Sequence, residues 1–242
     1  MSTYIISDIH GCYDQYQELL CRIDFSEEDE LYILGDVLDR GPEPIKVLLD
    51  LMDRVNATLI LGNHDATALM ILRQLAKEIT NDSINAITPE MLHICSAWLQ
   101  DGGHTTFEKF QKLERHAQAD VLSFLEDAST YETVECDGKL YILVHGGLGN
   151  FDISKELEEY KREELLWDRP DYSREYFPGG RIVLVTGHTP TIYIRDDRLP
   201  LIYEGNGHIA MDCGCVFGGR LAAYCIDTGK TTYVDGLSGR SI

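Results

Sequence analysis

The sequence predicts an α/β fold, and three observations support this prediction. Short apolar runs, of the length expected for buried strands, recur along the chain. In the first third of the chain, each run is followed by a polar loop and then by apolar residues at helical spacing. Five of the runs also end in a loop that contains glycine together with carboxylate, amide or imidazole side chains. Side chains placed at strand ends in this way can meet at one edge of a sheet.

The first predicted strand, Thr3 to Ser7, is rich in β-branched and aromatic residues. It runs into Asp8 and His10, and because a single residue separates them, both side chains can point toward one place. A carboxylate together with an imidazole suits a divalent ion such as manganese, iron or zinc. A helix is predicted next, because apolar residues recur at helical spacing from Tyr13 to Ile23.

The second predicted strand, Leu31 to Leu34, leads into the sequence Gly-Asp-Val-Leu-Asp-Arg-Gly at positions 35 to 41. Its two carboxylates, Asp36 and Asp39, lie beside the guanidinium of Arg40. Two acids and an arginine on one rigid element suit a cation site that also holds an anion. A helix with Pro44 in its first turn follows this loop.

The third predicted strand, Ala57 to Leu61, ends in a loop that carries Asn63 and His64. A helix is predicted from Ala66 to Ile79. Residues 80 to 129 are also predicted to be mostly helical, with a tight loop at the paired glycines that follow Trp98. Since no linker-like segment sets this region apart, we interpret it as a helical cap over the cleft, within a single domain of residues 1 to 242.

The second half of the chain continues the pattern. A β-hairpin with an Asp-Gly turn joins Tyr131–Glu135 to Leu140–Val144, and its second strand ends in His145. The strand Ile182–Thr186 ends in Gly187 and His188. The remaining predicted elements are a short charged helix at Glu156–Leu166 and three strands at Ile209–Cys213, Arg220–Ile226 and Thr231–Val234. We expect these three strands to form an antiparallel group that closes a second sheet.

Six side chains of oxygen or imidazole type lie at these strand ends: Asp8, His10, Asp36, Asn63, His145 and His188. One metal ion usually takes three protein ligands plus water, so six ligands predict two ions. Asp36 is the expected bridge between an ion held by Asp8 and His10 and an ion held by the other three. Such a pair brings the pKa of a bound water toward about 7 and clamps the attacking and leaving oxygens of a phosphoryl displacement.

Four further side chains fit the same chemistry. His64 is not needed as a ligand and is a candidate general acid, with Asp39 holding its imidazole in position. Arg40 and Arg169 can each bind phosphate oxygens in bidentate fashion. The sequence therefore predicts a phosphoester hydrolase in which metal-bound hydroxide attacks phosphorus directly. A serine nucleophile is disfavoured, because the chain has no Gly-x-Ser-x-Gly sequence.

Composition limits the partners. The chain has 21 Lys and Arg against 41 Asp and Glu, a formal charge of −20. Such a surface repels nucleic acid and anionic membranes, so neither is expected as a partner. No apolar run approaches the ~18 residues that a membrane span needs. With no signal-like N-terminal region and an odd count of seven cysteines, we expect a cytoplasmic protein. The sequence does not indicate the oligomeric state.

The strand-end sequences resemble those of the metal-dependent phosphoprotein phosphatases within the calcineurin-like metallophosphoesterases. The matching segments are 8–11, 35–41, 62–65, 145–148 and 187–189. The resemblance implies a four-layer αββα sandwich, with two mixed sheets flanked by helices. It also implies two divalent ions, of which manganese is the first expectation and iron, zinc, nickel and cobalt are alternatives. It implies the same roles for the residues singled out above, and Arg169 resembles the second phosphate clamp of the bacterial members.

Three positions depart from the family pattern and leave the substrate open. Ser7 replaces a usual glycine, Leu61 a usual arginine, and Asp65 the glutamate of protein phosphatases. An aspartate at position 65 is common in the related diadenosine tetraphosphate hydrolases, but these usually lack an equivalent of Asp39. The first hypothesis is a bacterial-type protein phosphatase acting on phosphoserine or phosphothreonine, with phosphotyrosine as a further substrate. The alternatives are a bis(5'-nucleosyl)-tetraphosphate hydrolase and, third, an inactive phosphopeptide-binding module.

Overall fold

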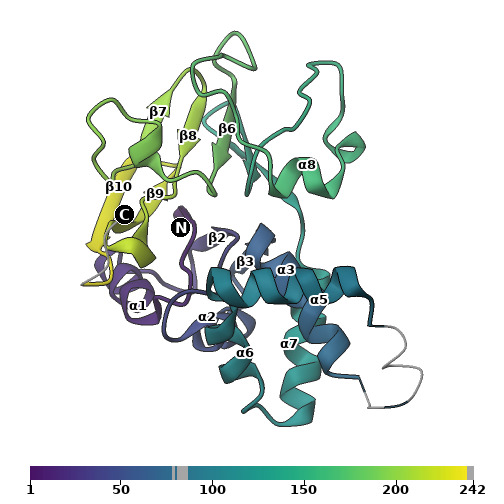
Figure 1. Ribbon diagram of the computed structural model, residues 1–242. Coiled ribbons are helices and arrows are strands. Elements are labelled where there is room, and N and C mark those ends of the chain that lie inside the picture. The colour runs from purple at the N-terminus through teal and green to yellow at the C-terminus, as the bar shows by residue number, and fades with distance from the viewer. Residues whose placement is uncertain (78–79, 81–86, 239–242) are drawn as a thin grey trace.

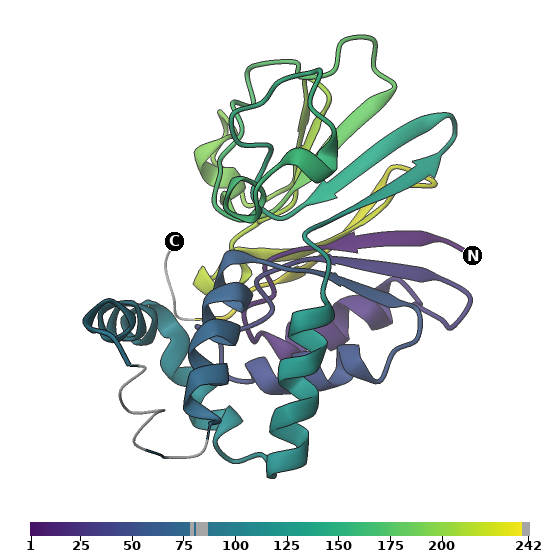
Figure 2. The same ribbon diagram turned by 90° about the vertical axis from the view of Figure 1, so that its right-hand side faces the viewer.

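Two mixed β-sheets pack face to face in the computed structural model, which describes residues 1–77, 80 and 87–238 (Figure 1 and Figure 2). Helices cover the outer face of the first sheet, and α8 (Arg162–Leu166) with its flanking loops lies over the second (Figure 1 and Figure 2). This arrangement confirms the predicted α/β fold of two mixed sheets flanked by helices. The predicted helix Ala66–Ile79 ends at Leu75 in the structure, four residues early, and Ile79 and positions 81–86 of the cap segment fall outside the described residues.

The first sheet has the strand order β10-β9-β1-β2-β3. Its strands are β1 (Thr3–Ile6), β2 (Glu30–Leu34), β3 (Ala57–Ile60), β9 (Arg220–Cys225) and β10 (Lys230–Asp235). The first three are parallel, and β9 and β10 run antiparallel to their neighbours. The connecting helices are α1 (Tyr13–Arg22), α2 (Pro44–Met52) and α3 (Asn63–Leu75).

The second sheet has the strand order β4-β5-β6-β8-β7. Its strands are β4 (Tyr131–Cys136), β5 (Lys139–Val144), β6 (Ile182–Thr186), β7 (Tyr203–Gly205) and β8 (His208–Ala210). The predicted hairpin between β4 and β5 is confirmed. Asp137 and Gly138 both have positive φ, at 48° and 74°, as the tight turn between twisted strands requires.

The core between the sheets consists of side chains on alternate strand positions. Ile5, Leu34 and Ile60 of the first sheet face Leu143 and Val185 of the second, and all five are fully buried. Removing one such side chain from water stabilises the fold by about 1.5–3 kcal/mol. The opposite face of the first sheet packs against the helices in a separate apolar cluster. Burial on both faces fixes both sheets, and with them the loops at their strand ends.

The prediction for the C-terminal strands was wrong. We expected one antiparallel group in the second sheet, but β9 and β10 join the first sheet, where β9 pairs with β1. The strand β8 joins the second sheet and runs parallel to β6. Five consecutive residues of β9, from Leu221 to Cys225, are buried, so this strand belongs inside a sheet. It covers the edge of β1 that would otherwise leave apolar residues and backbone groups exposed.

The helical segment after residue 87 packs beside α2 and α3. It comprises α5 (Pro89–Trp98), a π-helical turn (Leu99–Gly103), α6 (His104–Phe110) and α7 (Arg115–Asp127). The Thr88 hydroxyl accepts the Met91 N–H at 3.1 Å, as expected of an N-cap. α7 lies against α3, and α6 against α2 (Figure 2). The division into one domain with a cap stays a prediction.

Short turns and one short helix make up the remaining elements. The predicted helix Glu156–Leu166 is interrupted, because Lys161 has an extended backbone with ψ of 150°. A 3-10 turn (Leu157–Glu159) and α8 (Arg162–Leu166) stand in its place. Further 3-10 turns occur at Thr191–Tyr193 and Cys215–Phe217. Among the described residues, no helix combines the length and apolar character needed to cross a membrane.

Candidate functional site

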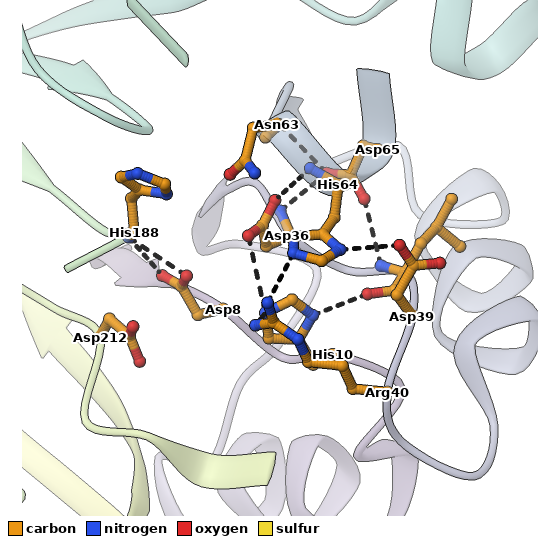
Figure 3. A network of polar contacts seen from close by, with 12 residues as sticks. Asp8, His10, Asp36, Asp39, Arg40, Asn63, His64, Asp65, His188 and Asp212 are labelled. Carbon is orange, nitrogen blue, oxygen red and sulfur yellow. Dashed lines mark hydrogen bonds and ion pairs between the residues drawn. The ribbon is translucent and has the colours of Figure 1, made fainter. Parts of the chain in front are cut away.

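The predicted site residues come together where the strands of both sheets end (Figure 3). They surround a cavity of about 260 Å³, which is lined among others by Asp8, His10, Asp36, Arg40, Asn63, His64, Arg169 and His188. Asp39 and His145 are fully buried directly behind this lining and contact it. All ten side chains singled out from the sequence therefore lie in or against one cavity.

The loops that carry these side chains have an unusual backbone. Positive φ angles of 45° to 70° occur at Asp8, His10, Asp36, Asp39, Arg40 and His188. This conformation costs free energy in residues with a Cβ and is typically retained at functional sites. The loops also approach closely, because a Cβ on Gly35 would lie 2.5 Å from the Gly62 backbone. Glycine at position 35 therefore allows the ends of β2 and β3 to meet.

The side chain of Asp65 holds these two loops together. Its fully buried carboxylate accepts the backbone N–H groups of Asp36 at 2.7 Å and of Val37, Leu38 and Gly62 at 3.1 Å each. The helix α3 consequently begins three residues earlier than we predicted from its apolar pattern. The polar first turn carries no apolar periodicity that would have indicated a helix there.

Replacing Asp65 with alanine is expected to lower the free energy of unfolding by about 3–5 kcal/mol, because it leaves four buried N–H groups without an acceptor. Urea unfolding with a chelator present would measure this without a contribution from bound metal. Asp65→Asn is the matched control and should lose less, since its amide oxygen still accepts. Equal stability of wild type and Asp65→Ala would contradict the anchoring role.

Two histidines turn their Nε2 atoms toward Asp36. His10 donates its Nδ1–H to the Leu38 carbonyl at 2.8 Å, and His145 donates to the Leu34 carbonyl at 2.7 Å. Because a carbonyl can only accept, Nδ1 of each ring carries a proton, and Nε2 is the atom that faces the cavity. The two Nε2 atoms lie 3.5 Å and 3.4 Å from Asp36 Oδ2. Carbonyls that fix imidazole tautomers in this way are typical second-layer partners of metal ligands.

Asp36 belongs to two groups of metal-type donors. One consists of Asp36, His145 and His188, and the other of His10, Asp36 and His64, with the donor atoms of each group within 4.8 Å of one another. Asp36 is thus the shared carboxylate, in line with its predicted bridging position. The second group contains His64 where we expected Asp8. The assignment of individual ligands to two ions stays a prediction.

The carboxylate of Asp8 lies beside this cluster, toward Asp212 (Figure 3). Both of its oxygens accept the His188 N–H, at 3.1 Å each. Burial, followed by the charge of Asp212, raises the pKa of Asp8 well above its usual value. Burial also raises the pKa of Asp212 to about 6. Two buried acids that disfavour each other's charge fit a site in which a divalent cation offsets the repulsion.

The imidazoles support the same conclusion. Burial lowers the pKa of His188 to about 3, so that this ring is neutral and able to ligate a metal. Burial alone would lower the pKa of His145, but the Asp36 carboxylate outweighs it and raises the value to about 10. The Arg40 guanidinium donates to Nε2 of His10 at 2.8 Å and of His64 at 2.7 Å. The donor set therefore attracts positive charge. A metal ion would compete for these donors with the second proton of His145 and with the Arg40 guanidinium.

His64 and Asp39 form a buried pair next to this cluster. His64 Nδ1 donates to Asp39 Oδ2 at 2.7 Å. The acid is held from behind by the Trp98 indole N–H at 2.8 Å and the Thr106 hydroxyl at 2.6 Å. Burial opposes protonation of His64, but Asp36 and the bond to Asp39 outweigh it, so the pKa of His64 is raised. The two carboxylates therefore favour protonation of the ring, whereas the Arg40 guanidinium, 2.7 Å from Nε2, opposes it.

Sequence reasoning missed several residues at the cavity, namely Asp101, Tyr193, Asp212 and Phe217. Asp101 approaches Arg40 Nη2 at 3.2 Å and His64 Nε2 at 3.4 Å. Asp212 follows the end of β8, so the rule that placed the other acids applies to it too. We missed it because the predicted strand ran on to Cys213, whereas β8 ends at Ala210.

Comparisons with known proteins agree with this geometry. The family model of calcineurin-like phosphoesterases matches residues 1–230. A curated relative named symmetrical bis(5'-nucleosyl)-tetraphosphatase, from Cellvibrio japonicus, is 28% identical over 95% of this chain and 97% of its own. A crystal structure described as a "putative diadenosine tetraphosphatase" has a TM-score of 0.67 at 22% identity, over 98% of this chain and 94% of that one. A serine/threonine phosphatase from Saccharomyces cerevisiae has a TM-score of 0.59 at 13% identity, over 100% of this chain and 81% of that one. The two structural similarities concern the fold alone.

Proposed function

The chain belongs to the calcineurin-like phosphoesterase family, and on that premise we propose that it hydrolyses dinucleoside polyphosphates. Members of this family are phosphoester hydrolases that use divalent metals at a binuclear site. The observation that carries the substrate proposal is the match to symmetrical bis(5'-nucleosyl)-tetraphosphatases along nearly the whole of both chains. This reverses our order of hypotheses from the sequence, in which the protein phosphatase came first.

The reaction we propose divides a dinucleoside tetraphosphate at its centre. The oxygen of water forms a bond to one of the two central phosphorus atoms, and the bond from that phosphorus to the central bridging oxygen breaks. Two nucleoside diphosphates are released, and the protons of water are shared between the bridging oxygen and solvent. Relatives that carry the word symmetrical in their names suggest this cleavage position.

The metal ligands we propose are Asp8, His10, Asp36, Asn63, His145 and His188, with Asp36 common to both positions. When bound, divalent ions would supply Lewis-acid stabilisation and lower the pKa of a water at the site. Carbonyls turn Nε2 of His10 and His145 toward the site, and His188 is neutral, so these rings could ligate the ions, His145 after it gives up its second proton. Manganese is our expectation for the native metal.

The substrate phosphates meet the only arginines that line the cavity within the described residues, Arg40 and Arg169. Each guanidinium can hold two phosphate oxygens, which orients the phosphorus toward the metal ligands. A local cation pair of this kind is needed, because the chain's charge of −20 repels a polyanion at longer range. The cavity of about 260 Å³ suits phosphoryl groups, and the nucleosides would lie outside it.

The Asp39–His64 pair favours a second candidate, hydrolysis of phosphomonoesters in proteins. Such substrates leave as alcohols that need a proton, and His64 is the group placed to provide it. Its contact with Asp39 at 2.7 Å supports that function. The departure at Asp39 from the usual pattern of dinucleotide hydrolases points the same way.

A substrate panel tests the proposal. We expect a higher kcat/KM for diadenosine tetraphosphate than for phosphoserine, phosphothreonine or phosphotyrosine peptides in the presence of manganese. Chromatography of the products should give ADP alone, whereas ATP with AMP would indicate cleavage away from the centre. A preference for the phosphopeptides would instead establish the second candidate.

A further inference from the structure

Two exposed aromatic rings stand beside the site. Ten large hydrophobic side chains are exposed in the part of the chain that the structure describes, and only Trp167 and Tyr193 among them are aromatic. Their exposed fractions are 45% and 72%. An exposed ring is not stabilised by packing in the core. Both rings line hollows that belong to the site or adjoin it.

Tyr193 lines the central cavity itself. It ends the short 3-10 turn that follows His188, and Pro190 and Phe217 contribute further apolar surface to the same cavity. The Phe217 ring lies 5.3 Å from the guanidinium carbon of Arg40. Apolar surface is thus present directly beside one of the two phosphate-binding arginines that we propose.

Trp167 lines a second hollow that adjoins the first. The two share Asn63, His64 and Asp101, and the second is completed by α5 residues that include Ile94 and Ala97. Trp167 also lies two positions before Arg169, the other arginine of the central cavity. The Phe217 ring thus lies beside Arg40, and the hollow lined by Trp167 adjoins the central cavity at Asn63, His64 and Asp101.

We propose that Trp167 and Tyr193 stack on the two nucleobases of the substrate, an inference that rests on the proposed function. A dinucleoside polyphosphate has a base at each end of one phosphate chain. The cavity that Tyr193 lines, and that adjoins the hollow of Trp167, contains metal-type ligands and both arginines. Rings recognise bases without regard to sequence, because every base has a π-face. Stacking would also favour binding of the polyanionic substrate, which the acidic surface repels at longer range.

The test compares the substrate with its phosphate chain alone. For Trp167→Ala and Tyr193→Ala, we expect kcat/KM for diadenosine tetraphosphate to fall by about 5- to 150-fold each, the range of a single base-stacking contact. The inhibition constant of inorganic tripolyphosphate in the same reaction should change by less than about twofold, because this anion has no base. Trp167→Phe and Tyr193→Phe should recover most of the loss, since they keep a ring.

Ile153→Ala serves as a matched control, because Ile153 is also exposed, at 67%, but lines neither hollow. If the alanine variants cleave diadenosine tetraphosphate as well as wild type, the stacking inference is overturned while the proposed function stands. Equal losses for dinucleotide and tripolyphosphate would overturn it too, since they would indicate a displaced Arg169 or Arg40. If wild type cleaves phosphopeptides but not the dinucleotide, the proposed function fails, and this inference fails with it.

Discussion

Replacing Asp36 with asparagine is expected to lower kcat/KM for every phosphoester substrate by at least about 1000-fold, because the site loses several kcal/mol of metal-dependent stabilisation. Asp36 is the one carboxylate common to both donor groups. Asparagine has a single acceptor oxygen and no charge, so it cannot serve two cations. Initial rates with manganese, together with the bound metal per chain by mass spectrometry, would measure the effect.

Asp29 provides a matched control, since it is also a buried aspartate flanking β2, at the amino end of that strand. Its carboxylate accepts from Ser2 and Ser26, and nothing of it lines the cavity. Asp29→Asn should keep its activity and its metal content.

Chelation should inactivate wild type, and added manganese should restore wild type but not Asp36→Asn. Full activity of Asp36→Asn with two ions bound would remove Asp36 from the bridging position.

The convergence of the site could be predicted because its signals are local. Each ligand follows directly on a buried strand, and strand ends of parallel segments share an edge. Asp36 after β2 and Asn63 after β3 needed no knowledge of distant pairing. His145 and His188 follow strands of the other sheet, so their approach to Asp36 depends on how the two sheets pack. For these two histidines, the prediction was supported by the resemblance of the chain to the calcineurin-like metallophosphoesterases, because hydrophobic periodicity does not show how two sheets pack.

Long-range pairing is what the sequence did not reveal. The apolar run of β9 is compatible with either sheet, and only its pairing with β1 decides between them. Thr106, which holds Asp39, is 67 positions away from it, and no local pattern connects the two. Asp212 was within reach of the strand-end rule, but an error of three residues in the end of β8 hid it.

His64→Asn is expected to affect substrates according to their leaving groups. Protonation by a positioned side chain contributes about 100- to 10000-fold when the leaving group is a strong base, as the serine alkoxide of a phosphoserine peptide is. We expect a loss in that range for such a peptide and a much smaller one for p-nitrophenyl phosphate, whose phenolate leaves without a proton. The Asp36 and Asp39 carboxylates raise the pKa of His64, which favours the ring form that carries the proton. The measurement is kcat/KM for both substrates, with His116→Asn, an exposed histidine on α7, as control.

The same variant separates the two candidate functions. A nucleoside diphosphate is a weakly basic leaving group, so central cleavage of a dinucleotide gains little from a buried acid. If His64→Asn leaves diadenosine tetraphosphate cleavage nearly intact while abolishing that of phosphopeptides, the Asp39–His64 pair serves phosphomonoesters. If both fall together, His64 does more than donate a proton, for instance by holding Arg40, which contacts its Nε2 at 2.7 Å. Equal losses for the peptide and the p-nitrophenyl ester would take His64 out of the acid role.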